Sequence, residues 1–472
     1  MAPSMILLPE ILLLVGALIV LFAEYLPGGD RSAAIIGTVL AAGAAKLVWV
    51  LPVKGVLFGG MLAFDGTPSA VIRSSVAALT AVFLVWIAGN GWSGTRARDA
   101  VSMVLFSSCG GMLLATVNDI VMLFMALELA TMPAYVLMGY RRDDRRGLEG
   151  TLKYFLMSVL TSLVMAYGLS FIYGISGSTS YSAINLAKGG SLGLFAGMLV
   201  IVGFFAKMSA APLHFWAPDA YEGASAPAVA YVSSVAKVAA LYAMIRFIAI
   251  ILPSIPALPM VLVLVSILSM ALGNLAALPQ TDIRRIIAYS GVAHVGYLML
   301  GLATGTPVGY AASAFYVLVY AVPSLGIMLV VGEEGPKLAD VAGLVSRKPL
   351  AAWSSLVFLL SLIGIPPMAG FFGKLYLFGA ALSGGAVVAV VIALLLSVVS
   401  AGYYFKVVRA MFTPGEGAPQ VPVSGASVEA VEPEYPRIAW LGGLAIVLCA
   451  VATLGIGLAS QPLLTLLGVA FN

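Results

Sequence analysis

The chain has 472 residues, of which 61% are hydrophobic and only 9% are charged, and its mean hydropathy is +1.07. Soluble globular proteins carry about 25% charged residues, so this composition excludes a water-exposed globular domain and indicates an integral membrane protein in a lipid bilayer. The formal net charge of +4 is too small and too scattered to indicate nucleic-acid binding.

The sequence lacks the usual motifs for cofactors and metals. Its two cysteines, Cys109 and Cys449, lie in apolar runs and are too few for an iron–sulfur cluster or a disulfide framework. Two histidines cannot supply several haem ligand pairs, and no glycine-rich nucleotide motif is found. We therefore predict that this chain holds no cofactor and no metal ion of its own.

Apolar runs of roughly 17 to 25 residues, the length that crosses a bilayer, recur along the whole chain. The first run has no cleavage signature and is expected to be a retained helix. A segment rich in Pro and Gly, 413–436, is expected to be a loop. We predict an all-α integral membrane protein with about fourteen transmembrane helices, at 4–24, 32–53, 73–92, 100–117, 119–140, 150–174, 192–216, 226–251, 256–278, 283–303, 308–332, 350–382, 385–412 and 437–468.

The basic residues of the predicted loops alternate along the chain. Cytoplasmic loops of membrane proteins are enriched in Lys and Arg. Even-numbered loops contain little beyond Lys54 and Lys188. Odd-numbered loops hold Arg31, Arg96, Arg98, residues 141–146, Arg284, Arg285, Lys337, Arg347, Lys348, Lys406, Arg409 and Arg437. This alternation supports the number of helices and predicts that both termini lie on the non-cytoplasmic side of a cell inner membrane.

Five charged residues remain inside the predicted helices: Glu128, Lys153, Lys207, Lys237 and Lys374. Each costs about 2.5–3.5 kcal/mol at a helix centre on the insertion scale. A lysine near a helix end avoids part of this cost by extending its ammonium group to water, and Lys153 is the best candidate. Lys237 lies about eleven residues into its helix, beyond easy reach of either surface. We interpret the buried lysines as parts of an ion path, with a purely structural role as the alternative.

Glu128 and Lys153 lie on successive predicted helices. A buried lysine beside a carboxylate that can move or be protonated has two accessible charge states, so this pair is a candidate switch. Counting along ideal helices from residues 141–146, at about 1.5 Å per residue, leaves the two side chains offset in depth by roughly 10 Å. Helix tilt or intervening water must close that offset, or the two charges interact only weakly.

Helix breakers occur in two predicted helices, as "SAAP" (209–212) in the seventh and "GIPPMAG" (364–370) in the twelfth. Broken helices at corresponding positions of two halves are typical of a transport path, although proline kinks also occur in ordinary bundles. The two breaks are five helices apart, and an odd spacing requires inverted units. We predict two inverted five-helix repeats, helices 4–8 and 9–13, with broken helices 7 and 12. The chain is then expected to consist of helices 1–3 (1–99), the first repeat (100–251), the inverted second repeat (256–412), and a loop with helix 14 (413–472).

Several motifs resemble one family of membrane proteins. "KMSAAPLHFWAPDAYEGASAPAVAYVSSVAKVAA" (207–240), "LPQTDIRRIIAYSGVAHVGYLMLG" (278–301) and "GIPPMAGFFGKLYLF" (364–378) resemble the N-type antiporter-like membrane subunits of bacterial NADH–quinone oxidoreductase, respiratory complex I. The resemblance runs from about residue 100 to 412. M-type relatives carry Glu where this chain has Lys374, and "SSVAKVA" (233–239) is typical of the N-type. Multi-subunit cation/proton antiporters share much of the same pattern.

The resemblance implies a role for each charged residue of the spans. Glu128 and Lys153 would form the charge pair of the first repeat, Lys207 the switching lysine, Lys237 the central relay and Lys374 the terminal lysine. His294 in "SGVAHVGY" would bridge the central and terminal lysines, although a lone histidine in an apolar helix is as often structural. Candidate lining residues of a water chain are Tyr289, Tyr316 and Tyr320.

The implied function is that of a proton-translocating membrane-arm subunit of NADH:quinone oxidoreductase, a translocase only as part of its complex. FMN, iron–sulfur clusters and quinone are then expected in partner subunits, and M-, K- and L-type subunits are the expected membrane neighbours. A subunit of a multi-subunit Na⁺/H⁺ antiporter or of a related membrane-bound hydrogenase is the first alternative. A structural subunit whose charges merely pack is the second. The electron donor, the quinone, the transported ion and the order of proton transfer stay open.

Overall fold

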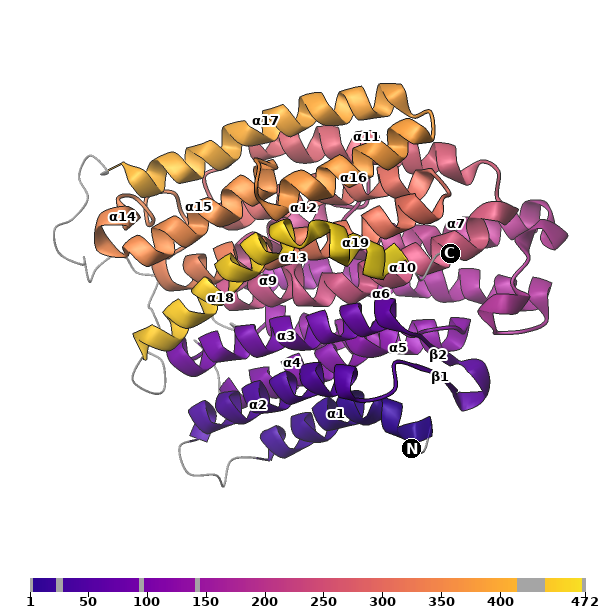
Figure 1. The fold of residues 1–472 in the computed structure, drawn as a ribbon, viewed down its shortest axis with the longest axis horizontal. Coiled ribbons are helices and arrows are strands. Elements are labelled where there is room, and N and C mark those ends of the chain that lie inside the picture. The colour runs from indigo at the N-terminus through magenta and orange to yellow at the C-terminus, as the bar shows by residue number, and fades with distance from the viewer. Residues whose placement is uncertain (1–2, 23–28, 93–96, 141–144, 414–437, 469–472) are drawn as a thin grey trace.

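The computed structural model describes residues 3–22, 29–92, 97–140, 145–413 and 438–468, and Figure 1 shows how their helices lie side by side. The helices are α1 (Leu8–Leu21), α2 (Gly29–Val50), α3 (Thr67–Asn90), α4 (Ala97–Leu114), α5 (Ile120–Met138), α6 (Arg145–Ser176), α7 (Ser191–Lys207), α8 (Trp216–Gly223), α9 (Ala226–Ser233), α10 (Val235–Ile251), α11 (Leu258–Ala277), α12 (Ile283–Ala303), α13 (Pro307–Glu334), α14 (Leu344–Arg347), α15 (Pro349–Ile363), α16 (Ala369–Ser383), α17 (Val387–Phe412), α18 (Ala439–Leu458) and α19 (Ser460–Gly468).

Within the described residues, ten helices are long and apolar enough to cross a membrane, and four more apolar helices are shorter. Large apolar side chains such as Leu160, Leu264 and Val398 remain exposed on the outside of the bundle, where lipid would replace water. The chain is therefore an integral membrane protein built of helices. The predicted loop 413–436 lies outside the described residues, apart from Thr413. Of the predicted basic loops, Arg96, Arg437 and residues 141–144 also lie outside them.

Between α2 and α3 the chain forms a small antiparallel hairpin that the sequence analysis did not predict. Strand β1 (Lys54–Leu57) pairs with β2 (Leu62–Asp65), with Lys54 opposite Asp65 and Leu57 opposite Leu62. In Figure 1 this hairpin, the start of α1 and the end of α19 all lie toward the same end of the bundle, while α14 lies at the other end.

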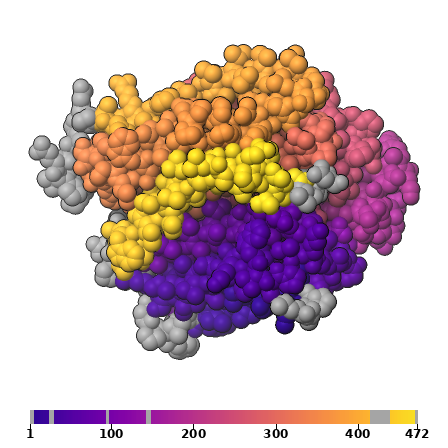
Figure 2. All heavy atoms as spheres, viewed as in Figure 1, coloured from indigo at the N-terminus to yellow at the C-terminus, as the bar shows by residue number. Residues whose placement is uncertain are grey.

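The centre of the bundle is α13, whose membrane-crossing part is completely buried. It packs against α9, α10 and α12, which precede it in the sequence, and against α15 and α16, which follow it. Figure 2 shows α18 and α19, in yellow, lying across the boundary between the indigo N-terminal helices and the orange C-terminal ones. These two C-terminal helices pack on α3, near the start of the chain, and on the central α13.

Two interruptions lie where the sequence predicts them, between α7 and α8 and between α15 and α16. Backbone groups freed inside a membrane need partners, and side chains supply several of them here. The indole Nε1 of Trp216 donates to the carbonyl oxygen of Ala206 at 2.9 Å, and the Ser269 hydroxyl accepts from the Ala211 amide at 3.0 Å. In the second interruption the Gly370 amide donates to Ser361 Oγ at 3.1 Å.

A third interruption was not predicted, because 226–251 was expected to be one helix. The membrane-crossing length is confirmed, since Ala226–Ser254 is long and apolar enough to span a membrane, but the segment is not one regular helix: α9 ends at Ser233, and Ser234 has φ −119° and ψ −81°, outside the helical region. The Ser234 hydroxyl donates back to the Ala230 carbonyl at 2.5 Å, the kind of local bond that bends helices. Lys237 therefore lies in the first turn of α10 and not deep inside a continuous helix. The predicted helix 437–468 is likewise divided at Ala459.

A buried ion pair ties α1 to α3. Arg73 Nε lies 2.6 Å from Glu10 Oε1, and its Nη2 donates to Glu10 Oε2 at 2.8 Å and to the Ile6 carbonyl at 2.9 Å. Both side chains are at most 3% exposed. The carboxylate also lies in the first turn of α1, where the partial positive charge of the helix end favours it.

We expect Arg73→Met and Glu10→Leu each to lower the stability of the protein by about 3–5 kcal/mol, because each leaves one buried charge without its partner. The double variant should recover most of this loss. Thermal unfolding of the detergent-solubilised protein measures the effect. Lys188→Met is the control, since Lys188 is exposed and its replacement should change stability little. A double variant less stable than either single one would contradict the prediction.

Candidate functional site

The first charged pair of the membrane interior joins α5 to the end of α7. Lys207 Nζ lies 3.1 Å from Glu128 Oε1, with the lysine side chain 2% exposed and the glutamate 15%. Thr131 Oγ1 and Tyr135 OH each lie 3.4 Å from the same ammonium group. Ser162 donates to Glu128 Oε1 at 2.6 Å. The carboxylate therefore offsets a charge whose isolation at this depth would be very costly.

The predicted pairing of Glu128 with Lys153 is wrong in this structure. Lys153 Nζ instead lies 2.8 Å from Glu149 Oε1 and 2.8 Å from Asp219 Oδ2, and its side chain is 44% exposed. The reason is depth: Glu128 lies level with Ser162 of α6, which donates to it, whereas Lys153 lies nine residues earlier in the same helix, about 13 Å along its axis.

Lys237 is buried at the interruption between α7 and α8. Its ammonium group lies 3.4 Å from Ser209 Oγ, 5.7 Å from the ring centre of Tyr221 and 6.0 Å from that of Tyr320. Ser209 has a positive φ of 61°, a conformation that a regular helix does not contain. The broken helix thus places one hydroxyl beside Lys237 only two residues after Lys207. Within the described residues no carboxylate pairs with Lys237.

His294 of α12 is fully enclosed by tyrosines. Its Nδ1 lies 2.8 Å from Tyr316 OH and its Nε2 lies 3.2 Å from Tyr404 OH, which also bonds to Ser290 Oγ. The Tyr320 ring lies 5.0 Å away, centre to centre. Imidazole and phenol groups both donate and accept, so a proton can enter at one ring nitrogen of His294 and leave at the other.

Lys374 of α16 lies against the end of α15. Its ammonium group donates to the Ile363 carbonyl at 2.7 Å, to the Leu362 carbonyl at 3.2 Å and to Ser397 Oγ at 2.7 Å. Leu362 and Ile363 are the last residues of α15, whose carbonyls have no helical partner and carry partial negative charge. The predicted interruption therefore creates the binding site for this lysine.

Polar and aromatic side chains connect these lysines across the centre of the bundle. Ser209 links the first interruption to Lys237, and Tyr320 lies beside both Lys237 and His294. Tyr297 lies 5.8 Å from His294, ring to ring, and 5.0 Å from Lys374 Nζ. The predicted path residues brought together in this line are Glu128, Lys207, Lys237, His294 and Lys374; Lys153 is the one that lies outside it.

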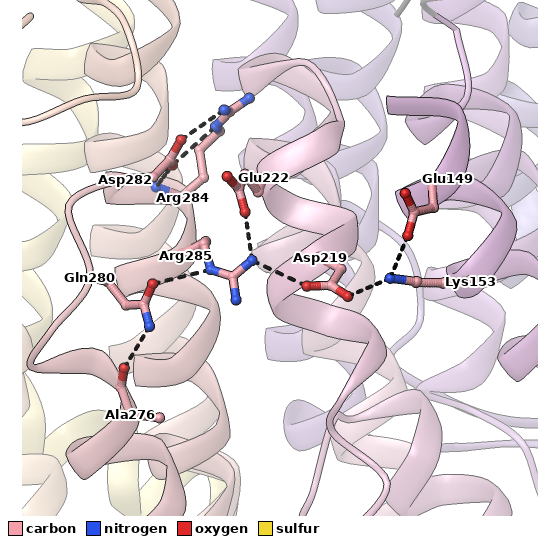
Figure 3. A network of polar contacts seen from close by, with 9 residues as sticks. All are labelled: Glu149, Lys153, Asp219, Glu222, Ala276, Gln280, Asp282, Arg284 and Arg285. Atoms are coloured by element: carbon pink, nitrogen blue, oxygen red, sulfur yellow. Dashed lines mark hydrogen bonds and ion pairs between the residues drawn. The ribbon is translucent and has the colours of Figure 1, made fainter. Parts of the chain in front are cut away.

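A second charged network lies around α8 (Figure 3). Asp219 binds Lys153 of α6 through Oδ2 and Arg285 of α12 through Oδ1, at 2.8 and 3.1 Å. Arg285 also lies 2.5 Å from Glu222 Oε2 and donates to Gln280 Oε1 at 3.1 Å. Arg285 further stacks near Tyr289, so that tyrosine belongs to this network and not to the surroundings of His294.

Asp219, Glu222 and Arg285 were not predicted as a unit, although the motifs at 207–240 and 278–301 contain all three. The available signal was the i, i+3 spacing of the two acids in "WAPDAYEG", which places them on one face of a helix. In the part of the chain that the structure describes, no group of three or more His, Cys, Asp or Glu residues is placed to hold a metal ion.

Interrupted membrane helices joined by a buried line of lysines define the class of antiporter-like ion-translocating membrane proteins. Residues 117–400 match the family model described as "NADH:quinone oxidoreductase/Mrp antiporter, TM", which is more than half of the chain. The chain belongs to this family.

Relatives and solved structures agree with that assignment. The chain is 34% identical to NADH-quinone oxidoreductase subunit N of Rhodospirillum rubrum, covering 90% of this chain and 91% of the relative. It is 36% identical to NAD(P)H-quinone oxidoreductase subunit 2 of Microcystis aeruginosa, covering 97% of this chain and 92% of the relative. A chain of Thermus thermophilus respiratory complex I has a TM-score of 0.81 at 30% identity, and the match covers 97% of this chain and 98% of that chain. The resemblance to N-type subunits is confirmed.

A chain of the Mrp complex from a Dietzia species has a TM-score of 0.84, with 100% of this chain and 97% of that chain covered. The identity is 24%, so this similarity concerns the fold alone.

Proposed function

We propose that this chain is the N-type, proton-translocating membrane-arm subunit of an NADH:quinone oxidoreductase, respiratory complex I. It acts as a translocase within that complex, while FMN, iron–sulfur clusters and quinone belong to partner subunits. The observation that carries the proposal is the buried line of side chains from Lys207 through Lys237 and His294 to Lys374. The chain that holds this line is 30% identical to a chain of a respiratory complex I.

The proposed architecture has about fourteen membrane crossings. Four of these crossings are each formed by a pair of successive helices: α7 with α8, α9 with α10, α15 with α16, and α18 with α19. Helices 4–8 (residues 100–251) and 9–13 (256–412) are inverted repeats, preceded by 1–99 and followed by 413–472. Equal positions of the interruptions in the two units support this. The start of α1 and the end of α19 lie toward one end of the bundle, as an even number of crossings requires (Figure 1). Both termini then face the non-cytoplasmic side of a cell inner membrane.

The mechanism is an electrostatic relay. Glu128 is 15% exposed, so a charge arriving from a neighbouring M-, K- or L-type subunit can act on its ion pair with Lys207. When Glu128 is neutralised or moves away, Lys207 loses its partner and releases a proton toward Lys237 past Ser209. His294 transfers it to the Lys374 side. Moving one proton against 100 mV costs about 2.3 kcal/mol, which the loss of one buried ion pair can supply.

Two other functions make different predictions. A subunit of a cation/proton antiporter or membrane-bound hydrogenase is supported by the fold shared with the Mrp complex chain. A structural subunit would use its lysines only for packing. Three buried lysines that all lie on one connected line, and not at scattered positions, favour ion transport over packing.

The test uses the complete complex in proteoliposomes, with NADH and a short-chain quinone. We expect quinone reduction to drive proton uptake without sodium, and Lys207→Ala to reduce both pumping and coupled quinone reduction severely while the complex stays assembled. Lys188→Ala, at an exposed position, is the control and should change neither. Proton–sodium exchange without NADH would instead identify an antiporter, and full pumping by Lys207→Ala would exclude the relay.

A further inference from the structure

Helix α8 is a short element whose position depends on its neighbours. It has 8 residues, is preceded by the irregular stretch 208–215 and is separated from α9 by only two residues. A helix of that length is not stable by itself, so tertiary contacts must hold it. It contacts α6 on one side and α12 on the other.

The contact with α6 is close. A Cβ added at Gly150 would lie 2.6 Å from the Asp219 carbonyl oxygen, so the two backbones nearly touch. The Tyr154 ring stacks on Trp216 at 4.6 Å with an interplanar angle of 26°. Lys153 then reaches Asp219 from the same face of α6.

The contact with α12 is polar and lies at the other side of α8. Arg285 binds Asp219 and Glu222, while Arg284 Nη1 donates to the carbonyl of Ala224 at 2.9 Å, directly after the helix. Asp219 is thus the one described carboxylate that binds cations from both α6 and α12 (Figure 3). It joins the two halves of the chain through α8.

Two residues after Asp219, the same helix carries the residue that covers the central lysine. Tyr221 is fully buried, and its ring centre lies 5.7 Å from Lys237 Nζ. Asp219 itself is 37% exposed. One short helix therefore connects a solvent-accessible charge network to the buried environment of Lys237.

We infer that Asp219 is a positioning residue of the relay: its bonds to Lys153 and Arg285 hold α8 so that Tyr221 closes off Lys237 from the aqueous surface. When these bonds open, α8 moves away from α6 and α12 and Lys237 becomes reachable from that surface. The inference rests on the proposed function in so far as Lys237 carries protons. Because the bonds are partly exposed, salt weakens them.

The experiment measures accessibility without turnover. Ser225, the second residue after α8, is 7% exposed and is replaced by cysteine, while the native Cys109 and Cys449 are buried. A membrane-impermeant maleimide is applied to the intact complex. We expect Asp219→Asn to raise the labelling rate of the introduced cysteine several-fold and Asp219→Glu to stay near the parent rate. High NaCl should raise labelling of the parent and have little effect on Asp219→Asn.

Glu149→Gln is the matched control, because the described ion pair of Glu149 is with Lys153 within α6 and not with α8. It should leave labelling unchanged. Lys153→Met breaks one side of the network and should give a smaller increase than Asp219→Asn, which keeps the test decisive if one variant fails to fold. Equal labelling of parent and Asp219→Asn overturns the inference.

Proton pumping by the same variants separates the inference from the proposed function. We expect Asp219→Asn to pump several-fold more slowly at matched assembly, with rescue by Asp219→Glu. Increased labelling with unchanged pumping would show that α8 does not position the relay. If Lys237 variants pump normally while labelling still responds to Asp219, the proposed function fails and the role of Asp219 in holding α8 stands.

Discussion

Lys237→Met and Lys237→Arg are both expected to lower NADH-driven proton pumping about 100-fold, at unchanged assembly of the complex. Methionine fills much of the same space but cannot carry a proton. Arginine keeps the positive charge but does not release its proton in proteins. Loss of a positioned proton-transfer group typically costs about 10²–10⁴-fold in rate, and the lower figure applies if water partly replaces the side chain.

The arginine variant separates two roles that an alanine variant confuses. A lysine that serves only as a fixed charge beside Ser209, Tyr221 and Tyr320 would tolerate arginine, whereas a proton carrier would not. Pumping and quinone reductase rates are measured in proteoliposomes, with Lys188→Met at an exposed position as the control. Near-normal pumping by Lys237→Arg would make Lys237 a structural cation, and near-normal pumping by Lys237→Met would remove it from the path.

Lys374→Glu is expected to retain part of the pumping rate, whereas Lys374→Gln and Lys374→Met lose it. The ammonium group of Lys374 donates to the carbonyls of Leu362 and Ile363 at the end of α15. A protonated glutamic acid can donate to the same carbonyls and can also release its proton, because burial favours its neutral form.

Glutamine is the decisive comparison, because it has the shape of glutamate and donates hydrogen bonds but does not titrate. A difference between the two variants therefore measures proton transfer at this position, apart from packing. A purely structural lysine predicts the opposite order, since burying an unpaired carboxylate costs more than burying a thioether or an amide. Methionine or glutamine variants that pump faster than Lys374→Glu, at matched assembly, would remove Lys374 from the path.

Local features of the sequence were sufficient for the class of protein and for much of the site. Hydrophobic runs predicted membrane helices because the bilayer demands length and apolarity of each segment separately. The interruptions at 209–212 and 364–370 were predicted because proline removes a backbone donor wherever it stands. Lys207, Lys237 and Lys374 were recognised because a charge inside an apolar segment is costly whatever its neighbours are. The unpredicted interruption at Ser234 also has a local cause, but serine pairs are common inside helices and predict little by themselves.

Only the tertiary structure decided which charges pair. Sequence proximity suggested Glu128 with Lys153, but helix depth and orientation place Glu128 beside Lys207 and place Lys153 beside Asp219. The Asp219–Arg285 bond likewise joins helices 66 residues apart. Hydropathy and helix breakers are properties of one segment, whereas a bond of about 3 Å requires the tilt, rotation and depth of two segments together. Those quantities arise when the helices pack, which is why the sequence determined the inventory of charges and the tertiary structure determined their connections.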